Sequence, residues 1–211
     1  MGALADILDL ARWAPSGDNT QPWRFELVGP EHAVIHGFDT RDHCVYDFAG
    51  RASQVSLGAL LETITIAASG YGFVVSVQRR MHLPETRPTF DVHLLADARV
   101  RADPLIDSIR VRSVQRRPLS TRPLRDEQKA ALEAAVGSDH SVLWLEGFAD
   151  RLRMARLLFA NAKIRLTMPE AYPVHRDVIE WGVQFSEERI PDQAIGLDRV
   201  TTRDRKSTRL N

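Results

Sequence analysis

Cysteine is almost absent from the chain, which contains only Cys44 among its 211 residues. A single thiol cannot form a disulfide within the chain and has no second thiolate with which to bind a metal. A disulfide framework and a structural zinc site made of thiolates are therefore both excluded. We expect Cys44 to be a buried or neutral thiol.

Long hydrophobic runs are also missing. The longest apolar-rich run, residues 56–68, contains Glu62 and three hydroxyl residues and is too short to cross a bilayer. The N-terminus lacks a basic region followed by a hydrophobic stretch. With 44% hydrophobic and 27% charged residues, the composition is that of an ordinary globular chain. We therefore expect a cytoplasmic protein with no membrane partner.

Three classes of catalytic motif are absent as well. The seven histidines show no HxH spacing, and the one HxxxH pair, His32 and His36, lies on a predicted strand rather than a helix, so no metal site is predicted. The sequence has no glycine-rich dinucleotide loop, and neither Ser56 nor Ser113 lies in the context of a nucleophile elbow. These absences disfavour Rossmann-type dinucleotide binding and hydrolase chemistry.

Net charge is zero, with 28 basic and 28 acidic residues, but residues 199–211 contain five basic residues and one acid. The remainder of the chain is therefore acidic by four charges, and we expect no nucleic-acid partner. Residues 199–211 are predicted to form a disordered basic tail. The closing letters RKSTRLN resemble translated adapter sequence, which predicts a truncated reading frame.

Hydrophobic periodicity predicts an α+β fold. A short helix before Pro15, with Leu4, Ile7 and Leu8 on its apolar face, precedes two strands at 23–28 and 32–38. A long buried helix over 53–69 is followed by strands at 73–80 and 90–96, which suggests a central antiparallel sheet flanked by helices. Further along, we expect helices at 126–136, 148–168 and 170–188 and a strand at 140–147.

The order of helix, polar turn, strand and glycine occurs twice, at residues 4–29 and again at 123–147. The second turn is shorter and lacks the amides and prolines of the first. A duplicated unit with one degenerate copy would explain this echo.

The first of these turns, residues 14–22, is called the amide loop below. Pro15 and Pro22 restrict the residues before them, so Gln21 is expected to be extended, and Gly17-Asp18 permits a tight turn. Ser16, Asn19 and Gln21 both donate and accept hydrogen bonds, which suits a polyol chain or the edge of a heterocycle. A capped polar turn without a ligand is an equally simple interpretation of these residues.

The stretch ARWAPSGDNTQPWRF (11–25) resembles the APSxxNxQPW segment of the flavin-dependent nitroreductase family, in which this loop lies against FMN. A second stretch, RSVQR (112–116), resembles the family's Arg-x-Ser-x-basic motif, which holds the FMN phosphate. The match is partial, because Val114 stands where the family has a hydroxyl and Ser113 lies one position early. A long helix followed by GYG (70–72) is a third similarity, and together these elements cover most of residues 3–136.

The resemblance implies a nitroreductase-like fold in a permuted order, because ordinary relatives place the phosphate-binding arginine before the amide loop. This order is similar to that of fused relatives with two nitroreductase-like halves in one chain. Residues 1–108 would then be the first half and 109–198 the start of a degenerate second half. A complete chain would be a monomer with an internal pseudo-dimer, and a truncated chain could form a homodimer.

The same resemblance implies an oxidoreductase that uses FMN and takes hydride from NAD(P)H for a small acceptor such as a nitroaromatic or a quinone. No catalytic acid or base is required, because the flavin N5 accepts and delivers the hydride. The alternative is a flavin-sequestering protein whose ring is covered by a lid within residues 170–196. In either case, the cofactor-binding residues carried over are Ser16, Asn19, Gln21, Arg112, Ser113 and Arg116.

Overall fold

The computed structural model describes residues 2–42, 44–114, 116 and 119–196. These residues form two compact units. The first contains the described residues up to 116 together with those from 170 onward, and the second contains those between 117 and 169. This division by contacts differs from the two predicted halves, 1–108 and 109–198, which were defined by internal similarity; that duplication stays a prediction.

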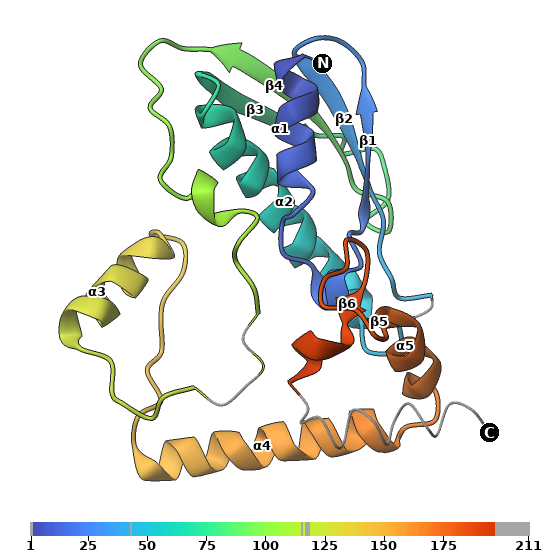
Figure 1. The fold of residues 1–211 in the computed structure, drawn as a ribbon, viewed down its shortest axis with the longest axis vertical. Coiled ribbons are helices and arrows are strands. Elements are labelled where there is room, and N and C mark those ends of the chain that lie inside the picture. The colour runs from blue at the N-terminus through green and yellow to red at the C-terminus, as the bar shows by residue number, and fades with distance from the viewer. Residues whose placement is uncertain (1, 43, 115, 117–118, 197–211) are drawn as a thin grey trace. The chain divides into compact units, whose positions relative to one another are not determined.

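A four-stranded antiparallel sheet organises the first unit. Its strands lie in the order β1 (Trp23–Leu27), β2 (His32–Gly37), β4 (Thr89–Ala96) and β3 (Phe73–Arg79) (Figure 1). The register places Ile35 of β2 opposite Phe25 on one side and Phe90 on the other. These four strands agree with the sequence pattern to within a residue or two, and the α+β class is confirmed.

Two helices cover one face of this sheet, α1 (Ala3–Ala11) and α2 (Arg51–Ser69) (Figure 1). Their apolar side chains meet the inward residues of the strands in a single core. Alternation along β2 and β4 sends every second residue to this core and the others to the opposite face. The buried members include Leu4, Ile7, Leu8, Leu57, Leu60, Ile64, Ala33, Ile35, Val92 and Leu94.

The rest of the first unit consists of short elements. The 3₁₀ turns are η1 (Gly17–Asn19), η2 (Phe48–Gly50), η3 (Ile106–Ser108) and η4 (Asp192–Ile195), and the strands β5 (Ile179–Glu180) and β6 (Ile190–Pro191) pair in parallel. The helix expected over 170–188 is wrong in extent, because α5 spans only Ala171–Val178. Beyond it, Ile179 pairs with Ile190, and Gly182 with φ 84° makes the left-handed turn between them.

The second unit contains α3 (Asp126–Ala135) and α4 (Phe148–Thr167), both close to their predicted ranges. The strand predicted over 140–147 is wrong, because these residues form neither strand nor helix. A strand requires a partner for its backbone groups, and no described strand pairs with this segment. None of the described residues between 119 and 169 is buried.

Among the helices that the described residues form, none combines the length and the apolar character needed to cross a membrane.

Candidate functional site

The amide loop joins α1 to β1 and has an unusual backbone. Asp18, Asn19 and Gln21 have positive φ angles of 50°, 58° and 45°, in the left-handed region that residues other than glycine seldom adopt. Such conformations cost free energy and persist only where surrounding contacts hold them. Three of them within four residues mark this loop as a candidate site.

The extended conformation expected for Gln21 is wrong, and hydrogen bonds explain the difference. The Gln21 amide N–H donates to Ser16 Oγ at 3.1 Å, while the Trp23 N–H donates to the Gln21 carbonyl at 2.7 Å. Gly17 N donates in turn to Ser56 Oγ on α2, at 3.3 Å. Ser16 therefore closes the loop from within, and the loop is tied to the core helix.

The two side-chain amides of the loop contact residues 185–189, called the covering segment below. Asn19 Nδ2 donates to the carbonyls of Glu187 and Arg189, both at 3.2 Å, and Gln21 Nε2 also donates to Glu187. Both side-chain amides thus act as donors to backbone carbonyls of the protein itself.

Side chains reinforce these backbone contacts. The Trp13 and Phe185 rings lie with centroids 5.4 Å apart, and Arg12 Nη1 lies 3.6 Å from a Glu187 carboxylate oxygen. The covering segment therefore lies against both the amide loop and the end of α1. Sequence reasoning placed a lid somewhere in 170–196 but had no signal that identified these contacts.

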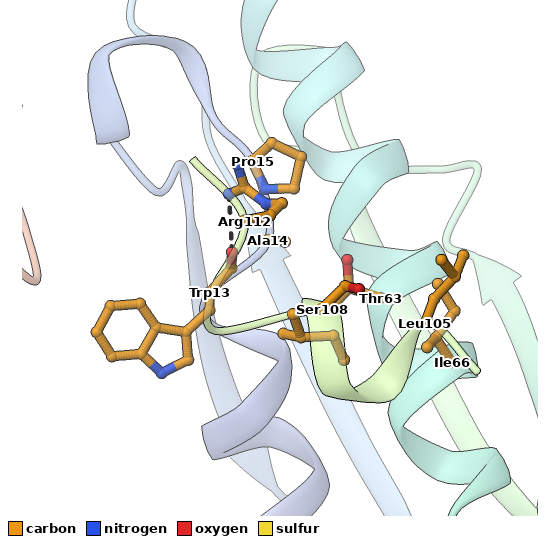
Figure 2. Close-up of a pocket in the computed structure, with 9 residues that line it drawn as sticks. Trp13, Ala14, Pro15, Thr63, Ile66, Leu105, Ser108 and Arg112 are labelled. Carbon is orange, nitrogen blue, oxygen red and sulfur yellow. Dashed lines mark hydrogen bonds between the residues drawn. The ribbon is translucent and has the colours of Figure 1, made fainter. Parts of the chain in front are cut away.

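Arg112 approaches the amide loop from a segment about one hundred residues further along the chain. Its Nη2 donates to the Trp13 carbonyl at 3.0 Å, and Figure 2 shows its guanidinium beside Ala14 and Pro15. Partial burial lowers the pKa of Arg112 because it disfavours the charged form. Since its partner here is a neutral carbonyl, the guanidinium keeps its net charge.

A small cavity of about 160 Å³ lies next to Arg112 (Figure 2). Its walls come from the end of α1, the middle of α2 and the segment around η3. Nine residues line it: Trp13, Ala14, Pro15, Thr63, Ile66, Leu105, Ser108, Ile109 and Arg112. Cavities that enclose drug-sized ligands have about 300 Å³ or more, so this one fits only a small group.

Arg116 reaches a different part of the same loop. Its Nη2 lies 4.0 Å from Asp18 Oδ1, and Tyr46 donates to the other oxygen of Asp18 at 3.3 Å. Ser113, between the two arginines in sequence, is exposed. The structure thus brings Arg112 and Arg116 to the loop that contains Ser16, Asn19 and Gln21.

A further cluster escaped the sequence analysis because it joins two strands. His32 on β2 lies beside Asp91 and His93 on β4, on the sheet face opposite the helices. The available signal was the alternating Asp-x-His triplet at 91–93 on a predicted strand, since residues two apart share a face.

No family model matches the chain, and no curated protein matches it. Among solved structures, a nitroreductase family protein from Clostridium difficile 630 aligns with 58% of this chain and 86% of its own, at 18% identity and a TM-score of 0.35. A TM-score this low supports no inference about fold or chemistry.

Proposed function

We propose that the chain is an FMN-dependent oxidoreductase of nitroreductase type, taking hydride from NAD(P)H for a small acceptor. One observation carries the proposal: the amide loop and the basic stretch 112–116, both picked out from the sequence, meet in space. Arg112 contacts Trp13 and Arg116 lies beside Asp18, although about one hundred residues separate them.

The phosphate end of FMN fits these residues best. A phosphate dianion prefers guanidinium donors, and Arg112 and Arg116 both reach the amide loop. Arg112 has a carbonyl as its partner, so a phosphate would gain a full charge pair with it. Arg116 would have to weaken its 4.0 Å contact with Asp18, which is long enough to cost little.

The ribityl and ring portions fit only if the covering segment moves. Asn19 and Gln21 are suitable donors for ribityl hydroxyls and ring carbonyls, but the carbonyls of Glu187 and Arg189 occupy them here. The cavity beside Arg112 is too small for the flavin ring. Displacement of the covering segment, or a second protein surface, would have to provide the space.

The bound cofactor would supply hydride acceptance and delivery at its N5 atom. The protein's own contribution would be to bind and orient. Arg112 and Arg116 would hold the phosphate, and Ser16 would keep the loop closed so that Asn19 and Gln21 present their amides in a fixed direction. The covering segment would exclude water from the loop when it is in place.

The covering segment also favours a second candidate function, flavin sequestration without turnover. It lies directly on the donors that would face the cofactor and is held there by an aromatic contact, an ion pair and three hydrogen bonds. A segment that moved to admit flavin and then closed over it would block access of NAD(P)H and of an acceptor.

Spectroscopy on the purified protein separates these functions. We expect a yellow protein, or one that becomes yellow with added FMN, and we expect NADPH or NADH to bleach the flavin band without oxygen. Flavin that binds but is not bleached would support sequestration. A colourless protein with no thermal shift in FMN would contradict both.

A further inference from the structure

The outer face of the sheet contains a compact group of three metal-ligating side chains. His32 on β2 and His93 on β4 are directly opposite in the register, and Asp91 lies two residues before His93 on the same face. One ligand atom from each lies within 4.8 Å of the other two. None of the three belongs to the candidate flavin site.

Backbone geometry explains why the two histidines are so close. The Leu94 N–H donates to the Glu31 carbonyl at 2.9 Å, which makes His32 and His93 a non-hydrogen-bonded cross-strand pair. Side chains of such pairs approach one another more closely than those of hydrogen-bonded pairs. The two imidazole rings accordingly stack with centroids 4.1 Å apart and an interplanar angle of 17°.

The separation between His32 and Asp91 is somewhat shorter than that of two ligands of one ion. His32 Nε2 lies 2.9 Å from Asp91 Oδ1. A metal held tetrahedrally at about 2.0–2.2 Å from an imidazole nitrogen and a carboxylate oxygen keeps these two atoms roughly 3.3–3.6 Å apart, so a small side-chain movement suffices. A metal ion could thus replace the proton between these atoms, with His32 retaining a proton on Nδ1.

Asp91 is held ready as an anion. Arg80 donates to both of its oxygens, from Nε at 2.7 Å and from Nη2 at 2.8 Å. Arg80 therefore fixes the carboxylate as the outer partners of metal ligands do, although its positive charge lowers the affinity for a cation.

The site is also open to solvent. His32 and His93 line a depression of about 340 Å³, and Glu31 borders it and contributes a further negative charge. Water molecules can complete the coordination of an ion there. Two imidazoles and one carboxylate with open positions select zinc, nickel or copper over magnesium or calcium.

We propose that His32, Asp91 and His93 form a binding site for a divalent transition metal, with Zn²⁺ as the representative ion. His93 must tilt out of its stack with His32 to bring its ring nitrogen to the ion, and a rotation about its side-chain torsions supplies this movement. The site is independent of the proposed flavin function.

Calorimetric titration of the EDTA-treated protein with Zn²⁺ tests the proposal. We expect binding that His93→Ala and Asp91→Asn each weaken at least tenfold. The matched control is His36→Ala, which removes a histidine on the same face of β2. His36 lies 2.7 Å from Glu26 and, among the described residues, belongs to no cluster of metal-ligating side chains. The affinity of His36→Ala for Zn²⁺ should stay within twofold of the wild type.

Nuclear magnetic resonance of the histidine rings reports on the site directly. Zn²⁺ should shift the ring signals of His32 and His93 and leave that of His36 unchanged, and excess Mg²⁺ should not reverse these shifts. The proposal is overturned if the wild type does not bind Zn²⁺, or if His93→Ala and Asp91→Asn, folded as judged by circular dichroism, bind it as tightly as the wild type.

Discussion

The two longest helices among the described residues differ in how far their side chains are buried. The 19-residue α2 has eight buried residues, whereas the 20-residue α4 has none, although it carries Leu157, Leu158, Phe159 and Ile164. The strands and helices of the first unit pack against one another and form its core. Residues 119–169 have the apolar side chains of a packed element but no core, so a second protein surface is expected to cover them. That expectation agrees with the predicted pseudo-dimer or homodimer, which stays a prediction.

Leucine truncation on each helix should show the largest difference between the two regions. Leu60 on α2 is 0% exposed, and Leu60→Ala should lower the free energy of unfolding by about 2–5 kcal/mol through lost burial and a residual cavity. Leu158 on α4 is 61% exposed, so Leu158→Ala should change the free energy of unfolding by less than about 0.5 kcal/mol. Urea unfolding of both variants at low protein concentration measures these values.

A large cost for Leu158→Ala at low protein concentration would contradict this difference between the helices, because it would mean that α4 is covered within a single chain. A cost that appears only as the protein concentration rises would identify a second copy as the expected cover. Sedimentation of the wild type over the same concentrations is the direct check.

A matched pair of aspartates sharpens the contrast at the start of each helix. Asp47 is buried before α2 and accepts hydrogen bonds from Thr40, Ser53 and the Ala52 N–H. Asp47→Asn should cost about 1–3 kcal/mol, because donors are left without an acceptor. Asp150 in α4 makes only an exposed ion pair with Arg153 in the described part of the chain, so Asp150→Asn should cost less than about 1 kcal/mol.

Asp47 also predicts how the free energy of unfolding depends on pH. Burial alone would raise the pKa of Asp47, but its hydrogen bonds outweigh this effect and lower the pKa below the ordinary value. The stabilisation is therefore fully present above the pKa of the unfolded chain, about 3.9, and is lost as pH falls through the lower folded value. Acid unfolding curves should converge for wild type and Asp47→Asn at low pH; a constant gap would contradict this assignment.

The smallest effect concerns the covering segment. Asn19→Ala removes two hydrogen bonds to the carbonyls of Glu187 and Arg189, so trypsin should cleave after Arg189 several-fold faster. Asn161→Ala, on exposed α4, should leave that cleavage rate unchanged. Equal rates in Asn19→Ala and the wild type would show that these contacts do not hold the segment.

The sequence predicted the sheet and the two covering helices of the first unit well because their signals are local and consistent. Alternation over 73–80 and 90–96 and the apolar faces before Pro15 and over 53–69 identified every strand and helix of the core. The strand expected at 140–147 failed because apolar residues are not sufficient; a strand also needs a neighbour for its backbone.

Residues of the candidate sites were likewise predicted where the signal is local in the sequence and missed where it depends on contacts between distant segments. Arg112, Arg116 and the amide loop were found as motifs, but the left-handed Gln21 was not, since its conformation depends on Ser16 and on the covering segment. The His32–Asp91–His93 cluster depends on pairing between strands that are distant in sequence. The Asp-x-His triplet at 91–93 supplies two of its members, but only the pairing of β2 with β4 brings His32 to them.

The most direct test of the proposed flavin site compares FMN with riboflavin, which lacks the phosphate. Fluorescence titration should show that FMN binds at least about tenfold more tightly, because an arginine–phosphate pair of this kind contributes roughly 1.5–3 kcal/mol. Arg112→Ala should lower that preference severalfold, because only Arg116 would remain to hold the phosphate, whereas Arg110→Ala, which removes a neighbouring arginine paired with Asp9, should keep it. Equal affinity for FMN and riboflavin in the wild type, or an unchanged preference in Arg112→Ala, would contradict the account.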